Sequence, residues 1–408
     1  MNIFRPQIPY VFHPPKYRPW LAPLLRWVAL RFHLQNQFKV FEVQVEGLDQ
    51  VHDLTRRGES IMITPNHADH ADPSLLVHAA AQRGLVFHFM AAREGFEKSR
   101  FNAFVLQAMG AFSVDREGAD LSAVKTAMEI LKRRRYPLVI FPEGEIYHHH
   151  ETLDALNEGV ATILLRTSRR LGADKTCYAI PTAIHYEHRP GVETTFSERL
   201  DQLERRITWK PLGHLDPVER IYRLGSGLLA LKEEEWLGRA QTGDFVERIQ
   251  TLQHRLVEEV EAKHGGVQEG EPIPQRVKML RNKIRTVIAD EEHALSQEAE
   301  WFLYHDLDRL FTAVQLYSYP GQYLREHPSV TRIAETLLKL EEDVLGEGRY
   351  EGSRIAYLKF GAPIDVNAFA ADQGLDQKTA VGPLTRRIAE EIQRLIEATA
   401  LKRMKAEG

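Results

Sequence analysis

A histidine and an aspartate with four residues between them, His67 and Asp72, follow a short apolar run at residues 60–65. An imidazole held by a carboxylate can act as a general base toward an alcohol, because the carboxylate fixes the ring tautomer and stabilises the imidazolium that forms. Neither serine nor cysteine lies between the two residues. We therefore expect the hydroxyl group that the base would activate to come from a substrate.

The same segment permits two other interpretations. Asp72 could simply cap a helix that begins at Pro73, with His67 as an ordinary loop histidine. Alternatively, four side chains could bind a metal ion, namely His67, Asp69, His70 and Asp72. No further ligand pattern accompanies these four residues, so we predict no metal site.

A second block runs from Gly110 to Arg116 with the sequence Gly-Ala-Phe-Ser-Val-Asp-Arg. Its centre has the character of a short strand, and an arginine at a strand end can bind a phosphate through two parallel hydrogen bonds. The competing interpretation is a surface ion pair between Arg116 and a neighbour such as Glu117.

Two further blocks follow predicted strands. Pro142, Glu143 and Gly144 come after the apolar run 137–141, where glycine lets the backbone approach a ligand closely. Glu143 could accept hydrogen bonds from a substrate or bind Arg116, although the block could also be a plain turn. In the apolar run 176–186, Pro181 predicts an edge strand or a bulge that shapes a pocket wall.

Apolar runs and helical patterns alternate through the middle of the chain. This rhythm predicts an α/β fold with a central, mostly parallel sheet flanked by helices, whose ligands bind at the carboxyl ends of the strands. The predicted strands are 38–46, 60–65, 85–92, 111–115, 137–141, 176–186 and 355–360, and the predicted helices between them are 73–83, 100–109, 121–135 and 153–171.

Only helical patterns occur between about residue 192 and residue 352. Asp216 and Asp244 have the character of helix N-caps, and a final helix is predicted over 377–402. We therefore predict a large all-helical insertion before the last strand. The expected parts are an N-terminal arm at 1–37, an α/β core at 38–192, the helical insertion at 193–352, and a last core strand with a C-terminal helix at 353–408.

Composition excludes several classes of protein. Of the 408 residues, 43% are hydrophobic and 27% are charged, which is typical of a globular chain rather than a disordered one. The single cysteine, Cys177, excludes an intramolecular disulfide and a cysteine-cluster metal site. No apolar segment approaches the roughly 20 residues of a spanning helix, and no secretory signal is recognisable. We expect an intracellular protein that does not bind nucleic acid.

The charge is unevenly distributed. Residues 1–41 carry six basic side chains, no acidic one and nine aromatic rings, so a net charge of −4 leaves −10 on the rest. Basic groups with tryptophan and tyrosine suit an anionic membrane surface, and residues 20–34 could form a short interfacial helix. We therefore expect a cytoplasmic protein, peripheral on the inner face of the membrane. The competing interpretation is that the arm packs on its own domain.

Taken together, the blocks resemble the glycerolipid acyltransferase family, of the lysophospholipid or 1-acylglycerol-3-phosphate acyltransferase type. That family shows Asn-His with an aspartate after four further residues, a block from glycine to arginine, then Phe-Pro-Glu-Gly, then an apolar strand with a proline. All four occur here in that order within residues 66–184. The resemblance covers residues 38–190 and about 350–370, and not the helical insertion.

The resemblance implies roles for the matching residues. His67 would be the general base and Asp72 its orienting partner, so that an acceptor hydroxyl attacks the thioester of acyl-CoA or acyl carrier protein without a covalent acyl-enzyme. No cofactor would be bound, and the acceptor would be a lysophospholipid or related glycerolipid. The implied contacts to its glycerol and phosphate are Gly110, Arg116, Glu143 and Gly144, with Asn66, Pro142 and Pro181 in support.

One departure leaves the acceptor open. Family members that act on lysophosphatidate usually continue the third block with Thr-Arg-Ser, whereas this chain has Glu145-Ile146-Tyr147. An arginine is thereby missing, and Glu145 would repel a phosphate. The following three histidines, 148–150, are expected in a solvated loop, with an accessory acceptor or metal site as the alternative. Two other functions remain, a non-enzymatic lipid- or acyl-binding scaffold and a thioester hydrolase, while chain length and oligomeric state are left open.

Overall fold

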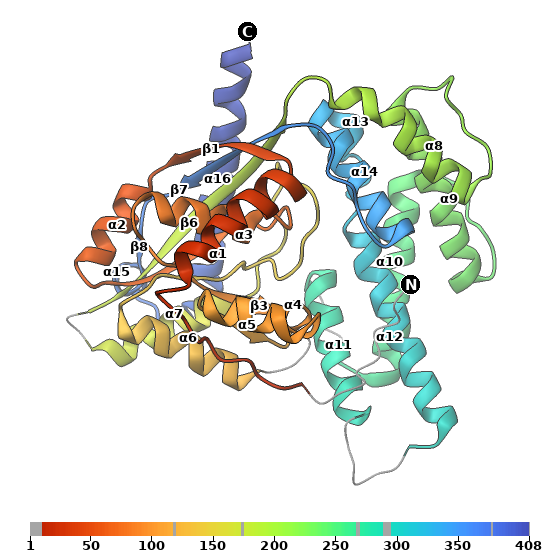
Figure 1. Cartoon of the computed structure of the whole chain (residues 1–408). Coiled ribbons are helices and arrows are strands. Elements are labelled where there is room, and N and C mark those ends of the chain that lie inside the picture. Colours follow the sequence, from red (N-terminus) through yellow and green to blue (C-terminus); the bar gives the residue numbers. More distant parts are fainter. Residues whose placement is uncertain are drawn as a thin grey trace. The chain divides into compact units, whose positions relative to one another are not determined.

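The computed structural model describes residues 10–116, 120–172, 175–266, 270–288, 295–376 and 378–407 (Figure 1). They fall into two compact units. An α/β unit contains Tyr10–Arg189 and Gly352–Gly408, and a helical unit contains Pro190–Glu351.

The α/β unit is built on an eight-stranded sheet. Seven strands follow the order β1-β7-β6-β2-β5-β3-β4, and β8 pairs with β6. Every pairing is parallel except those of β6 with β7 and β8. The strands are β1 Val40–Glu46, β2 Ser60–Pro65, β3 His88–Ala92, β4 Ala111–Val114, β5 Leu138–Val139, β6 Cys177–His188, β7 Arg354–Phe360 and β8 Ile364–Asp365. The predicted α/β fold with a mostly parallel sheet is confirmed, although the two-residue β8 after β7 was missed.

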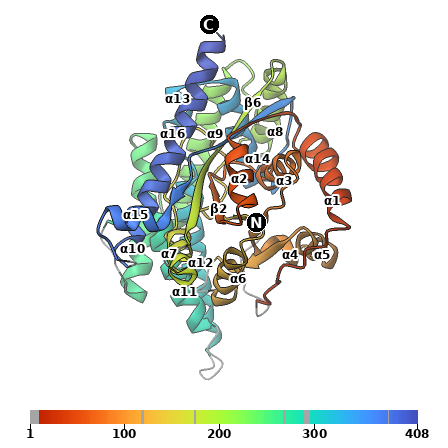
Figure 2. The same ribbon diagram turned by 90° about the vertical axis from the view of Figure 1, so that its left-hand side faces the viewer.

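Helices cover both faces of this sheet. An apolar core joins Met62 and Ala183 of the sheet to α6, α7 and α16. Figure 2 shows α2 and α3 on the side of the sheet opposite α16. The helices of the unit are α1 Ala22–Val28, η1 Ala29–Gln37, α2 Leu48–Arg56, α3 Asp72–Gln82, α4 Arg93–Glu97, α5 Arg100–Ala108, α6 Leu121–Arg133, α7 Gly159–Leu171, α15 Val366–Asp372 and α16 Val381–Glu407.

Strand direction decides where the site lies. Strands β2 to β5 pair in parallel with one another, so the loops that follow them leave the sheet at one edge. The loop after β2 carries His67, the loop after β4 carries Arg116 and the loop after β5 carries Glu143. Strand β2 is buried along its whole length, as expected for a strand covered on both sides.

The helical unit contains no strand within its described residues. Helices α9 and α10 begin at the predicted aspartates: Asp216 accepts hydrogen bonds from two backbone N–H groups of α9, and Asp244 does the same for α10. Two apolar cores hold the helices together. The helices are η2 Val192–Thr195, α8 Phe196–Ile207, α9 Pro217–Leu237, α10 Phe245–His264, α11 Ile273–Ile288, α12 Gln297–Tyr317, α13 Tyr323–Glu326 and α14 Val330–Leu345.

Two local predictions are wrong. The helix predicted from residue 153 begins at Gly159, and the chain before it is irregular. Pro181 lies in β6, an inner strand, and not at an edge. An inner strand tolerates this proline because β6 changes partner there: its pairing with β8 ends at Ala179, its pairing with β7 starts at Thr182, and the Pro181 carbonyl still accepts from Gly361 N.

The described part of the N-terminal arm packs on the α/β unit. Lys16 N and Arg18 N donate to carbonyls of α5, and Gln107 Nε2 donates to Pro14 O at 2.7 Å. Yet Trp20 and Trp27 stay 73% and 54% exposed, so packing leaves much of the aromatic surface uncovered. Within the described residues, no helix combines the length and apolar character that crossing a membrane requires.

Candidate active site

Asn66 fixes the loop that follows β2. Its side chain donates to Ile184 O at 3.0 Å and accepts from Ile184 N at 2.7 Å, so it forms a closed pair with the backbone of β6. The side chain is buried. Because both of these bonds anchor Asn66 to an inner strand, the next residue, His67, begins from a rigid point.

His67 and Asp72 meet as their spacing suggested. His67 Nδ1 lies 2.9 Å from Asp72 Oδ2, and the imidazole stacks on the Phe141 ring with centroids 3.9 Å apart. The His67 side chain is 15% exposed. In the part of the chain that the structure describes, its Nε2 atom has no hydrogen-bond partner. This arrangement leaves Nε2 available to a substrate hydroxyl.

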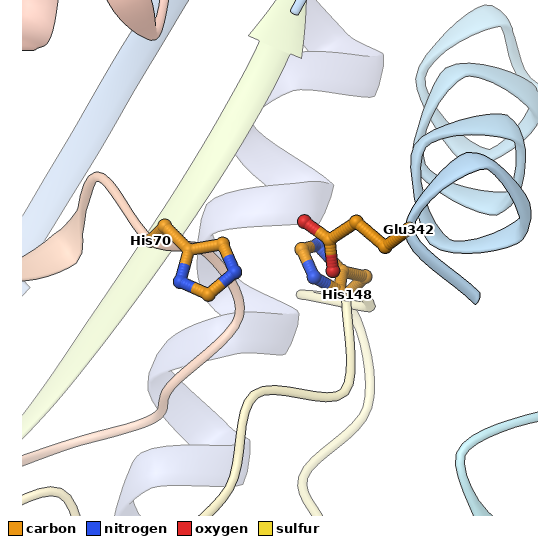
Figure 3. Close-up of side chains that lie close together, drawn as sticks. All are labelled: His70, His148 and Glu342. Atoms are coloured by element: carbon orange, nitrogen blue, oxygen red, sulfur yellow. The ribbon is translucent and has the colours of Figure 1, made fainter. Parts of the chain in front are cut away.

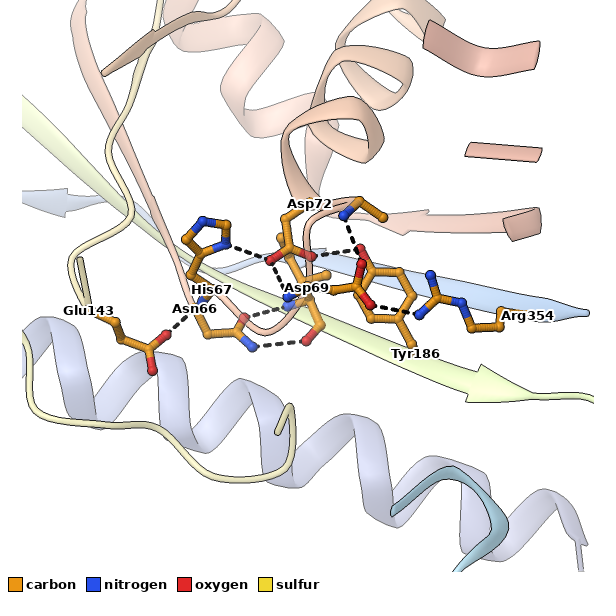
Figure 4. A network of polar contacts seen from close by, with 9 residues as sticks. Asn66, His67, Asp69, Asp72, Glu143, Tyr186 and Arg354 are labelled. Carbon is orange, nitrogen blue, oxygen red and sulfur yellow. Dashed lines mark hydrogen bonds and ion pairs between the residues drawn. The ribbon is translucent and has the colours of Figure 1, made fainter. Parts of the chain in front are cut away.

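Asp72 is completely buried and surrounded by donors. Besides His67 Nδ1, its carboxylate accepts from Asp69 N at 3.0 Å and from Tyr186 OH at 2.6 Å (Figure 4). The simple capping interpretation does not hold, because the N-cap of α3 is Ala71, whose side chain makes no capping bond. Three donors fix the orientation of the carboxylate toward His67. The Asp72 charge and burial, in turn, raise the pKa of the Tyr186 hydroxyl well above its usual value, burial being the larger cause.

A buried ion pair supports this network, and sequence reasoning missed it. Arg354 Nη1 lies 2.7 Å from Asp69 Oδ2, and the same guanidinium donates twice to Phe38 O. Burial alone would raise the pKa of Asp69, but the charge and hydrogen bond of Arg354, together with His148 and the backbone N–H of Ala71, outweigh burial and lower that pKa. Asp69 lies inside the first sequence block, whereas Arg354 belongs to β7. No local pattern connects residues so distant in sequence.

Glu143 contacts the backbone rather than Arg116. Its Oε1 accepts from His67 N at 2.6 Å and its Oε2 from Asp154 N at 3.1 Å. Burial, with the nearby Asp154 charge as a second cause, raises the pKa of Glu143 to about 8. Glu143 is therefore largely protonated at neutral pH, and it positions the backbone of His67 instead of supplying a charge.

Arg116 binds the residues that follow Glu143. Its Nη1 donates to Gly144 O at 2.8 Å and lies 2.9 Å from Glu145 Oε2, while its Nη2 lies 3.5 Å from Glu94 Oε1. About a third of its side chain is exposed. Glu145, expected to repel a phosphate, is thus neutralised by Arg116. The alternative partner, Glu117, lies outside the described residues.

Gly110 and Gly144 adopt backbone conformations that favour glycine. Gly110 has φ 92° and Gly144 has φ 80°, both in the left-handed region. A Cβ atom on Gly110 would lie 3.1 Å from the His88 ring, and one on Gly144 would lie 2.8 Å from Asn157 Nδ2. Asn157 also donates to Pro142 O at 3.1 Å, which ties the third block to the residues before α7.

The three histidines are not in a solvated loop. His148 and His149 are about 5% and 7% exposed, and His150 is fully buried. His148 has φ 57°, and its ring meets that of His70 with centroids 5.4 Å apart (Figure 3). His149 Nε2 lies 2.6 Å from Asp154 Oδ2. The prediction of solvent exposure was wrong, because residue type alone does not reveal how an irregular loop packs.

Comparison with known proteins agrees with this geometry. Residues 42–185 match the family model described as Acyltransferase. A glycerol-3-phosphate acyltransferase of Pseudoalteromonas translucida (strain TAC 125) is 29% identical over 177 residues. That match covers 42% of this chain and only about a fifth, 21%, of the relative's length. Residues 42–185 therefore match an acyltransferase domain, as the four sequence blocks predicted.

Proposed function

We propose that the chain transfers a fatty acyl group from acyl-CoA or acyl carrier protein to a hydroxyl group of a lysophospholipid or related glycerolipid. The observation that carries the proposal is the 2.9 Å contact between His67 Nδ1 and Asp72 Oδ2, with Nε2 left for a substrate. The buried carboxylate keeps the proton on Nδ1, so Nε2 is the basic atom.

The reaction then follows from the two atoms of the imidazole. The acceptor hydroxyl gives its proton to Nε2 of His67 while its oxygen forms a bond to the thioester carbonyl carbon. The carbon–sulfur bond breaks, and the leaving sulfur takes the proton back from the imidazolium. Asp72 stabilises that imidazolium, and Tyr186 and Asp69 N hold Asp72 in place. The products are an ester and a free thiol.

Arg116 is the proposed contact for the phosphate of the acceptor. Its guanidinium already binds Glu145, so an incoming phosphate has to displace that carboxylate. Glu145→Gln should therefore lower the KM for phosphate-bearing lysolipids, and it should leave the KM for uncharged monoacylglycerol unchanged. Steady-state kinetics on both acceptors measure this difference; an equal change for both would remove Arg116 from phosphate binding.

The acceptor is proposed to be collected at the inner face of a membrane. Trp20, Trp27 and Phe32 are exposed around α1 and η1, close in sequence to Arg26 and Arg31. Aromatic rings enter the interface, and each cation near anionic lipid contributes about 1 kcal/mol. Binding to phosphatidylserine-containing vesicles in a flotation assay should weaken with added salt. Binding that needs no anionic lipid would contradict the electrostatic part.

The decisive experiment measures free thiol from acyl-CoA and from acyl carrier protein with a panel of lysolipids. His67→Ala should abolish acceptor-dependent release, while His254→Ala, an exposed histidine of α10, should not change it. Activity that survives His67→Ala would overturn the mechanism. Thiol release without any acceptor would indicate a thioester hydrolase, and vesicle binding without turnover would indicate a lipid-binding scaffold.

A further inference from the structure

Three side chains of types that can bind a metal ion lie close together at the loop that follows the third block. His150 and Glu151 come from the segment 145–158, hereafter the 145–158 loop, and His185 comes from β6. One ligand atom from each residue lies within 4.8 Å of the other two. Both imidazoles are fully buried, and their rings are nearly perpendicular with centroids 4.0 Å apart.

We propose that His150, Glu151 and His185 bind a divalent transition-metal ion, with zinc as the best match. Two imidazole nitrogens and one carboxylate oxygen suit zinc, whereas calcium and magnesium prefer oxygen ligands alone. Zinc bonds of about 2.0 to 2.2 Å in tetrahedral geometry place ligand atoms about 3.3 to 3.6 Å apart. His150 Nε2 and Glu151 Oε1 are 4.0 Å apart. We expect Glu151, whose side chain is 20% exposed while both imidazoles are fully buried, to be the ligand that moves toward the ion.

The position of the ion indicates what it does. His185 directly follows Ile184, whose backbone is paired with Asn66. His150 belongs to the same loop as Asp154, whose backbone N–H donates to Glu143. A metal ion on His150 and His185 therefore links the 145–158 loop to an inner strand. Its role is structural: it holds the segment that contains Asp154 in register with the segment that contains His67.

This site differs from the metal interpretation of the first sequence block. That interpretation used His67, Asp69, His70 and Asp72, but Asp72 is already satisfied by three donors and Asp69 is paired with Arg354. The proposed zinc site does not depend on the acyltransferase reaction, because none of its three ligands is His67 or Asp72. Metal binding and catalysis can therefore be tested separately.

The test uses the full chain, stripped with a chelator and titrated with ZnCl₂. We expect about one zinc per chain by elemental analysis, a higher melting temperature after zinc addition, and cobalt(II) absorption bands of the intensity that tetrahedral sites give. Glu151→Gln changes one partly exposed ligand and should weaken zinc binding at least tenfold. His185→Gln should abolish it and remove the cobalt bands.

Two controls keep the outcome interpretable. His148→Gln replaces a buried histidine of the same loop that is not a proposed ligand, so its zinc stoichiometry should equal that of the wild type. If His185→Gln does not fold, Glu151→Gln alone decides. Absence of stoichiometric zinc binding by the wild type, or equal affinity of Glu151→Gln and the wild type, would overturn the proposal.

Discussion

Replacing Glu143 with glutamine should remove a pH dependence that this buried carboxyl gives to the stability of the α/β unit. In the folded protein the pKa of Glu143 is about 8, because of burial first and Asp154 second, whereas its ordinary value is 4.5. A group whose pKa is raised by folding binds its proton more tightly in the folded state. Its contribution to stability is fully present below pH 4.5 and is lost as the pH rises through about 8.

The magnitude follows from these two values. Each pKa unit corresponds to about 1.4 kcal/mol, so protonated Glu143 contributes up to about 5 kcal/mol to the free energy of unfolding. About 3 to 4 kcal/mol of this contribution is lost between pH 5 and pH 8. Glutamine cannot ionise, but its amide nitrogen cannot accept from His67 N or Asp154 N. That lost acceptor costs about 1 to 3 kcal/mol at every pH. The variant should therefore be less stable at pH 5 and recover relative to the wild type by pH 8.

The assay is urea unfolding of the wild type and the variant at several pH values. The unfolding transition whose midpoint differs between the two proteins is assigned to the α/β unit. Only the difference between the two proteins is interpreted, because 18 histidines titrate in the same range. Infrared difference spectra of wild type minus Glu143→Gln should show a protonated carboxyl at pH 7. A stability difference that is the same at pH 5 and pH 8, within about 0.5 kcal/mol, would refute the raised pKa.

Three further outcomes are expected. Tyr186→Phe removes a 2.6 Å hydrogen bond to the buried Asp72 carboxylate, so it should destabilise the α/β unit by about 1.5 to 3 kcal/mol. It should also lower kcat about tenfold at unchanged KM, and urea unfolding and steady-state kinetics on one preparation measure both effects. Gly144→Ala should lower the melting temperature because its Cβ meets Asn157, and it should lower it less in an Asn157→Ala background, where the clash is absent and only the cost of the positive φ remains. Trp27→Ser should weaken vesicle flotation without changing turnover on short-chain, water-soluble acceptors, and unchanged flotation would exclude this ring from the interface.

The regular parts of the α/β unit could be predicted because their residues obey simple periods. Strand β2 has the predicted bounds, since a strand buried on both faces is a continuous apolar run with a sharp end. Helices α9 and α10 begin directly after the predicted caps, Asp216 and Asp244. The contact between His67 and Asp72 could also be predicted, because only four residues lie between them in the loop that leads from β2 into α3.

Other features depend on contacts that no local pattern contains. Residues 153–158 have helical character, but Asn157 bonds to Pro142 and Glu143, and α7 begins only at Gly159. Arg354 reaches Asp69 because β7 returns to the sheet far along the chain. The burial of His150 and the raised pKa of Glu143 are likewise set by the packing of an irregular loop. Such features arise from contacts between residues that are distant in the sequence.

The junction between the two units has a consequence for the order of events during synthesis. Arg189 N donates to Ser353 O, so the helical unit leaves and rejoins the sheet at neighbouring positions. Arg354, the partner of Asp69, emerges from the ribosome only after all of Pro190–Glu351. At about 5 to 20 residues per second, on the order of fifteen to sixty seconds pass between the synthesis of His67 and that of Arg354 in the strand that completes its support. A nascent chain stalled within the helical unit would therefore carry every residue of the proposed catalytic pair and still lack a finished site.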